Sequence, residues 1–121
     1  MREEAMPPFP VAERARYAAL GYRIIEPAQP PCLLPRADWE PDSFVALKGD
    51  EVAISLIRAT HPRNGAWKRL LRNLKSHRVR RVKVVCPLWQ MKLVLTATGF
   101  SGPFHEGTGF MDRIDYWTKE L

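Results

Sequence analysis

A strongly amphipathic segment that leads into a β-branched run limits the fold of this chain more than any other feature. Four large apolar side chains recur at helical spacing inside residues 65–76, namely Trp67, Leu70, Leu71 and Leu74. This spacing predicts a helix over Gly65–Ser76 with one buried face. The following segment, Val82–Cys86, is rich in valine and predicts a strand. A helix joined directly to such a strand is typical of a crossover connection, so we expect a mixed α/β or α+β sandwich.

Prolines restrict the N-terminal third of the chain. Eight of the 11 prolines lie within the first 41 residues, so we expect this region to be extended or irregular. One short helix is predicted over Val11–Leu20, ending at Gly21 and burying Val11, Ala15, Ala18 and Ala19. We expect a single domain over residues 1–121, with a Pro-rich segment at 1–42 and a core at 43–121.

The remaining segments predict a hairpin, a second helix and a last strand. Phe44–Leu47 and Val52–Ile57 flank the turn Lys48-Gly49-Asp50, which is typical of a β-hairpin. A second helix is expected to start at Pro87 and to stop at Gly99. Its inward side chains are predicted to be Trp89, Leu93, Val94 and Ala97. A glycine-containing loop from Gly102 to Gly109 then precedes a strand over Met111–Thr118.

Positive charge is concentrated in one part of the sequence. Between Val52 and His105 there are eleven Lys and Arg residues and no Asp or Glu, whereas the rest of the chain holds 8 basic and 13 acidic residues. Such a segment repels itself unless it meets a polyanion, and two kinds fit: nucleic acid, or a phosphate-rich cofactor such as coenzyme A. An acidic protein would fit as well. We call the densest part the basic cluster: Lys68, Arg69, Arg72, Lys75, Arg78, Arg80 and Arg81.

Cysteine usage and hydropathy predict the cellular setting. Cys32 and Cys86 lie far apart without metal-type spacing, so we expect free thiols in a reducing compartment. No apolar run reaches the length of a signal peptide or a membrane span. We therefore expect a cytoplasmic protein with no membrane partner. No spacing of His, Cys, Asp and Glu predicts a metal site.

From about residue 44 to its end, the chain resembles the C-terminal half of a GCN5-related N-acetyltransferase (GNAT) domain. The stretch Arg63-Asn64-Gly65-Ala66 occupies the place of the family's phosphate-binding loop at a helix start, and Gly99-Phe100 occupies the place of its Gly-Phe pair. The resemblance implies acetyl-CoA as ligand, and acetyl transfer to an amine. It places cofactor binding at Ile57, Arg58, Arg63, Asn64, Gly65 and Ala66, in a cleft between parallel strands that also includes Val84–Cys86. The alternative for Asn64 is an ordinary capping residue of the helix.

Several positions depart from the family pattern. Trp67 stands where the family has a second small residue, and its bulk could block a phosphate. Leu88 and Leu95 replace the usual Asn and Tyr, so no tyrosine acid is carried over from the family. Candidate catalytic groups are therefore Glu106 or His105 as base, and Tyr116 as proton donor if its ring faces the cleft.

Two interpretations stay open at this level. One is a small acetyltransferase-like protein. The other is a non-catalytic accessory protein of phage or mobile-element type, whose basic helix binds nucleic acid or an acidic protein, in the host cytoplasm or the virion. Both interpretations use the same lysines and arginines, so charge alone does not separate them.

Overall fold

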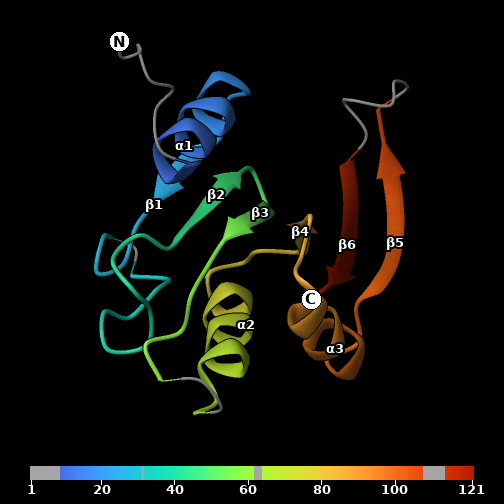
Figure 1. Cartoon of the computed structure of the whole chain (residues 1–121). Helices are drawn as coiled ribbons and strands as arrows, with labels where there is room; N and C mark the ends of the chain where they lie inside the picture. Colours follow the sequence, from blue (N-terminus) through green and yellow to red (C-terminus); the bar gives the residue numbers. More distant parts are fainter. Residues whose placement is uncertain (1–8, 31, 62–63, 108–113) are drawn as a thin grey trace, which may run out of the picture.

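Six strands and three helices make up the computed structural model, which describes residues 9–30, 32–61, 64–107 and 114–121. The helices are α1 (Phe9–Ala19), α2 (Ala66–Ser76) and α3 (Trp89–Ala97). The strands are β1 (Arg23–Ile25), β2 (Phe44–Lys48), β3 (Glu51–Leu56), β4 (Arg81–Val85), β5 (Ser101–Glu106) and β6 (Ile114–Glu120). All strands belong to one sheet, in the order β1-β2-β3-β4-β6-β5 (Figure 1). The expected mixed α/β architecture is confirmed.

One parallel pair interrupts an otherwise antiparallel sheet. β3 and β4 run parallel and are joined by the crossover helix α2, while the other neighbouring strands are antiparallel. Pairing between β3 and β4 runs from Glu51↔Arg81 to Ile54↔Val84 and then stops, although β3 continues to Leu56. The C-terminal ends of these two strands therefore separate. We call this place the splay.

The two faces of the sheet are covered unequally. α2 and α3 lie on one face, over a core that includes Leu70, Leu74 and Leu95. α1 lies on the other face, where Tyr17 packs with Phe44 in a smaller cluster (Figure 1). The α1 face is covered over the β1–β3 half of the sheet, since α1 packs on β1 and β2 and its Glu13 accepts a hydrogen bond from Ser55 of β3.

Helix α2 follows its sequence pattern closely. It buries Ala66, Leu70 and Leu74, exposes Lys68, Arg72 and Lys75, and ends at the predicted Ser76. Its N-cap is Gly65 in the left-handed conformation, at φ 77°. The alternative role of Asn64 as capping residue is therefore wrong.

Helix α3 is formed as expected, but its predicted inward face is wrong. Trp89 and Leu93 are 66% and 64% exposed, and Val94 and Ala97 are exposed as well. The buried residue is Leu95, at 0% exposure. Because this helix is apolar on all sides, its sequence does not mark which side faces the core.

Three other expectations need correction. Residues 101–106 form β5 rather than a loop; its two residues Gly102 and Pro103 stand opposite the single residue Trp117, so they sit in a bulge that tolerates both. In α1 the buried side chain is Tyr17, while Ala15, Ala18 and Ala19 are exposed, and the side chain of Val11 lies outside the described residues. The short strand β1 was not predicted. No helix in the described part of the chain is long and apolar enough to cross a bilayer.

Candidate functional site

A β-bulge lies where β3 leaves β4. Phe44 of β2 pairs with Leu56 of β3, and Ala46 pairs with Ala53. Between these pairs β2 has one residue, Val45, whereas β3 has the two residues 54 and 55. Such a bulge bends its strand and leaves one residue outside the ladder. The bulge and the splay together open the sheet at this point.

A large cavity with mainly apolar walls occupies the splay on the α2/α3 face. Its volume is about 730 Å³. We call it the apolar cavity, and its walls come from β3 and the following residues, from the end of β4, and from α3: Ile54, Ser55, Ile57, Arg58, Ala59, Val84, Val85, Cys86, Pro87, Leu88, Gln90, Met91 and Val94. Ligand pockets commonly have this size and this character, with a few polar groups in an apolar wall.

Chain segments distant in sequence hold the residues after β3 in place. The Ser43 side chain is fully buried and accepts a hydrogen bond from the Arg58 backbone N–H at 2.8 Å. Farther along, Asp38 accepts two hydrogen bonds from Arg69 at 2.8 and 2.9 Å, which attaches the first turn of α2 to the N-terminal third. The Arg69 guanidinium holds the pKa of Asp38 below its usual value. The Pro-rich segment thus fixes the position of the first turn of α2.

The residues predicted to bind the cofactor are brought only partly together. Ile57 and Arg58 line the apolar cavity. Asn64 and Gly65, just before α2, are exposed, and Ala66, the first residue of α2, is buried. Arg63 lies outside the described residues. At Gly65 a side chain would be strained by the positive φ, and its Cβ would lie 3.2 Å from the Arg69 guanidinium.

Trp67 is held against α3 and the residues that follow it. Its ring centroid lies 5.8 Å from that of Phe100, and its Nε1–H donates to Thr98 Oγ1 at 3.2 Å. The indole is thereby anchored at the C-terminal end of α3. These contacts give its bulk a packing role between the two helices.

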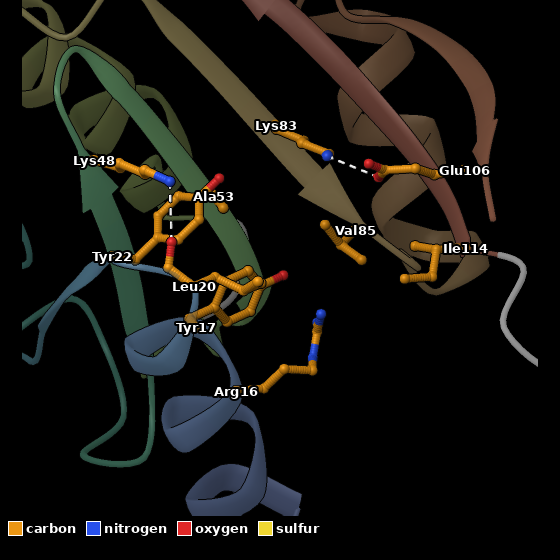
Figure 2. A pocket seen from close by; sticks show the side chains of 10 residues that line it. All are labelled: Arg16, Tyr17, Leu20, Tyr22, Lys48, Ala53, Lys83, Val85, Glu106 and Ile114. Atoms are coloured by element: carbon orange, nitrogen blue, oxygen red, sulfur yellow. Dashed lines mark hydrogen bonds and ion pairs between the residues drawn. The ribbon is translucent and has the colours of Figure 1, made fainter.

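A second, smaller cavity lies on the α1 face of the same splay (Figure 2). Its volume is about 270 Å³. We call it the polar cavity, and it is lined by Arg16, Tyr17, Leu20, Tyr22, Lys48, Ala53, Lys83, Val85, Glu106 and Ile114. Val85, near the end of β4, lines both cavities. The two cavities therefore approach one another where the parallel strands part.

The Tyr17 hydroxyl is the most unusual group in this wall. Tyr17 is 4% exposed, and its buried oxygen has no hydrogen-bond partner among the described residues. Arg16 and Ser55 lie near it, and Ser55 instead donates to Glu13 at 2.9 Å. Burial raises the pKa of Tyr17, which keeps the phenol protonated at neutral pH.

Of the three predicted catalytic residues, Glu106 reaches a cavity. It lines the polar cavity and accepts a hydrogen bond from Lys83 Nζ at 2.9 Å. His105 pairs with Asp115 at 2.7 Å and is absent from both cavity walls. Tyr116 stacks beneath Lys83 Nζ at 4.5 Å from its ring centre and is likewise outside both walls.

Internal carboxylates pair with part of the basic cluster. Three members form ion pairs, all with acidic residues from outside the acid-free segment: Arg69 with Asp38 at 2.8 Å, Arg81 with Glu120 at 2.8 Å, and Arg80 with Asp50 at 4.0 Å. Within the described chain, no ion pair is found for Lys68, Arg72, Lys75 and Arg78. The charge free to meet an external anion is thus smaller than the sequence implies.

Sequence reasoning missed Tyr17 and Ser55. Tyr17 is the largest apolar side chain of α1 on its buried side, which was a usable signal, because large side chains are buried before alanines. Ser55 had no such signal, since its place depends on the bulge in β3. Cys32 and Cys86 are both free and exposed. The described residues contain no group of three or more His, Cys, Asp or Glu side chains that could hold a metal.

Comparison with known proteins adds information on the fold. No family model matches the sequence, and a search of curated proteins finds no match. Solved structures do match. An acetyltransferase from Thermus thermophilus has 18% identity and a TM-score of 0.46 over 68% of this chain. This chain spans 58% of the length of that protein.

Two further structures match over the whole chain. A ribosomal-protein-alanine N-acetyltransferase from Brucella melitensis has 10% identity and a TM-score of 0.48, with 83% of that chain covered. A proposed acetyltransferase from Agrobacterium tumefaciens has 8% identity and a TM-score of 0.52, with 100% of this chain and 98% of that chain covered. The likeness to the Agrobacterium tumefaciens structure establishes a shared fold, and an identity of 8% carries nothing beyond the fold.

Proposed function

We propose that this chain, which has a GNAT-like fold, binds acetyl-CoA in the apolar cavity and transfers the acetyl group to an amine held in the polar cavity. One observation carries the proposal: two cavities of unlike character meet at the splay from opposite faces of the sheet, and Val85 lines both. A transfer reaction needs two reactants brought together in a fixed orientation. This arrangement supplies that geometry.

The residues of the apolar cavity fit a long thioester ligand. The walls around Ile54, Val84 and Met91 suit a flexible arm of largely apolar character. Arg58 lies in the cavity wall, and the exposed Gly65 directly precedes the first N–H groups of α2, where a helix favours anions. When bound, acetyl-CoA supplies an acetyl group activated as a thioester.

Residues of the polar cavity suit proton transfer. Glu106 can accept at its carboxylate the proton that the amine loses as the new C–N bond forms and the C–S bond breaks. The coenzyme A sulfur departs as a thiolate and takes up a proton from solvent. The bulge at Ile54–Ser55 leaves a backbone donor outside the ladder, which can stabilise negative charge on the carbonyl oxygen.

Calorimetric titration with acetyl-CoA tests the proposal, with thermal unfolding as a second readout. At a ligand concentration ~100 times Kd, binding stabilises the fold by about 2.7 kcal/mol, which raises Tm by several degrees. We expect Gly65→Glu to abolish this rise, because it places a negative charge at the phosphate end. Gly49→Glu is the matched control, since Gly49 also has a positive φ, of 62°, but lies at the opposite end of β3.

Absence of any heat or Tm shift at millimolar acetyl-CoA would overturn the proposal. Equal loss of the shift in Gly65→Glu and Gly49→Glu would place the ligand elsewhere. Salt-sensitive binding of nucleic acid without acetyl-CoA binding would instead favour an accessory protein that acts through the exposed residues Lys68, Arg72, Lys75 and Arg78.

A further inference from the structure

The polar cavity has an excess of positive charge. Among its described lining residues, Arg16, Lys48 and Lys83 are cationic and Glu106 is anionic, three charges against one. Glu106 is already paired with Lys83 at 2.9 Å. The wall as a whole therefore presents a net positive charge to any molecule that enters.

Acidic groups behind the wall reduce this excess without removing it: Glu13 forms an ion pair with Arg16 at 3.0 Å, whereas no ion pair of Lys48 is found in the described part of the chain. Glu13 accepts hydrogen bonds from Arg16 at 3.0 and 3.2 Å and from Ser55 at 2.9 Å. Glu51 accepts one from the Tyr22 hydroxyl at 3.2 Å. These carboxylates orient the wall and have little capacity left for a ligand.

Hydrogen-bond donors without a protein acceptor also favour an anionic ligand. The Tyr17 hydroxyl is buried and without a partner in the described chain, and Figure 2 shows it directed into the cavity beside Arg16. Arg16 binds Glu13 through Nε and Nη2, and no hydrogen bond of its Nη1 is found among the described residues. Lys48 Nζ donates to the Leu20 carbonyl at 3.0 Å and lies 5.4 Å from the centre of the Tyr22 ring, and no carboxylate partner is found for it in the described chain. A buried donor without an acceptor is costly, so a ligand that supplies oxygens is favoured here.

The size of the cavity limits the ligand. Its volume of about 270 Å³ is near the low end of small-molecule sites, which begin at about 300 Å³. A ligand of a few carbon atoms fits this space. Glu106, as the one carboxylate among the described lining residues, marks where an amine would be deprotonated.

From these observations we infer that the acetyl acceptor is a small amine that also carries an anionic group, a carboxylate or a phosphate. The amine lies toward Glu106, and the anionic group lies toward Tyr17, Arg16 and Lys48. This inference rests on the proposed function and adds the chemical class of the acceptor to it.

Three amines that each have three carbon atoms test the charge of the acceptor: β-alanine, propylamine and 1,3-diaminopropane, which differ at the end remote from the reacting nitrogen. Phosphoethanolamine is a fourth arm that distinguishes a phosphate from a carboxylate. Release of coenzyme A from acetyl-CoA measures kcat/KM for each. We expect at least one anionic amine to exceed propylamine at least tenfold and the diamine to be the poorest. Equal rates, or preference for the diamine, overturn the inference.

Two variants test which side chains recognise the anionic group of the acceptor. Tyr17→Phe removes a hydroxyl that has no partner in the described chain, so the fold is retained. We expect it, and Lys48→Gln, to reduce kcat/KM for the anionic amine about tenfold and to leave propylamine unchanged. Lys119→Gln on β6 is the control, because Lys119 lines neither cavity.

Direct titration with acetyl-CoA separates an error in the acceptor class from an error in the cofactor. If acetyl-CoA binds but the anionic amines show no advantage, the acceptor class is wrong and the proposed function stands. If acetyl-CoA does not bind, both are overturned. An equal loss for charged and uncharged amines in Tyr17→Phe would also contradict the inference, because it would give Tyr17 a role unrelated to the anionic group.

Discussion

The apolar cavity and the polar cavity share one opening in the sheet but differ in nearly every other respect. The apolar cavity is the larger, about 730 Å³ against about 270 Å³, and α3 forms one of its walls. The polar cavity is bordered by α1 and by cationic side chains. Neighbouring residues of β4 show the reason: Lys83 lines the polar side and Val84 the apolar side, because successive side chains of a strand point to opposite faces. A single splay therefore gives the sheet one face for a long apolar arm and another for a charged reactant.

The largest expected effect is on chemistry in the polar cavity. We expect Glu106→Gln to lower kcat about 100-fold or more, since removal of a general base has effects of this order. Acetyl-CoA affinity should stay the same, because Glu106 faces the other cavity. Glu120→Gln is the matched control: Glu120 is also ion-paired, with Arg81 at 2.8 Å, but lines neither cavity. Activity retained in Glu106→Gln would remove Glu106 as the base.

Filling the apolar cavity with a larger side chain should weaken the binding of acetyl-CoA. Val94 lies in the wall and is 38% exposed, so Val94→Trp can place its indole in the cavity without a loss of core packing. We expect the Kd for acetyl-CoA to rise at least tenfold, about 1.4 kcal/mol, as measured by calorimetry. Leu93 is the preceding residue of α3 and lies outside the cavity wall, so Leu93→Trp should bind acetyl-CoA with the affinity of the parent chain. Similar affinities in the two variants would show that the cavity does not hold the ligand.

A smaller effect is expected where the two faces are linked. Ser55 lines the apolar cavity, yet its hydroxyl donates to Glu13 of α1 at 2.9 Å. Ser55→Ala should lower the free energy of unfolding by about 1 kcal/mol, measured with urea. It should also raise the pKa of Glu13, whose pKa is lowered mainly by the hydrogen bond from Arg16 and further by Ser55. Ser76→Ala, which removes a bond within α2 alone, should leave the pKa of Glu13 unaltered.

The smallest expected effect is a change in acid sensitivity. The pKa of Asp38 is lower in the folded chain than in the unfolded chain, because Arg69 donates hydrogen bonds to it. Its contribution to stability is therefore present above the unfolded pKa of about 4 and is lost as pH falls through the folded pKa. Asp38→Asn should flatten the pH dependence of urea unfolding in this acid range.

Asp50→Asn provides the control for acid sensitivity. Asp50 pairs with Arg80 at a distance of 4.0 Å, and both side chains are largely exposed. We expect this variant to keep the pH profile of the parent chain. If the profile is unchanged in Asp38→Asn as well, the Asp38–Arg69 pair contributes nothing to acid sensitivity.

Local patterns predicted the elements that carry a clear signal of their own. Helix α2 has one leucine stripe against a basic surface, so both its ends and its buried face follow from the sequence. Helix α3 lacks such a contrast, and Leu95 is buried while Trp89 is exposed. The strand β5 was missed because Gly102 and Pro103 indicate a loop unless a bulge accommodates them.

The candidate site was accessible from the sequence in part. Ile57, Arg58 and Glu106 follow from the resemblance and from the residue types, and all three line a cavity. The place of Ser55 beside Tyr17 was out of reach, because the two residues lie 38 positions apart and meet across a packed helix and a bulged strand. The pairing of the basic cluster was equally hidden, since Asp38 and Arg69 approach one another only in the folded chain.

The sequence by itself determined the crossover unit, the hairpin before it and the imbalance of charge, because each depends on the spacing and type of neighbouring residues. Tertiary structure decided the rest: where β3 and β4 part, which cations keep a free charge, and which side chains face each cavity. These depend on strand register and on the packing of distant segments. Both are set by the free energy of the whole fold, and a local pattern records neither.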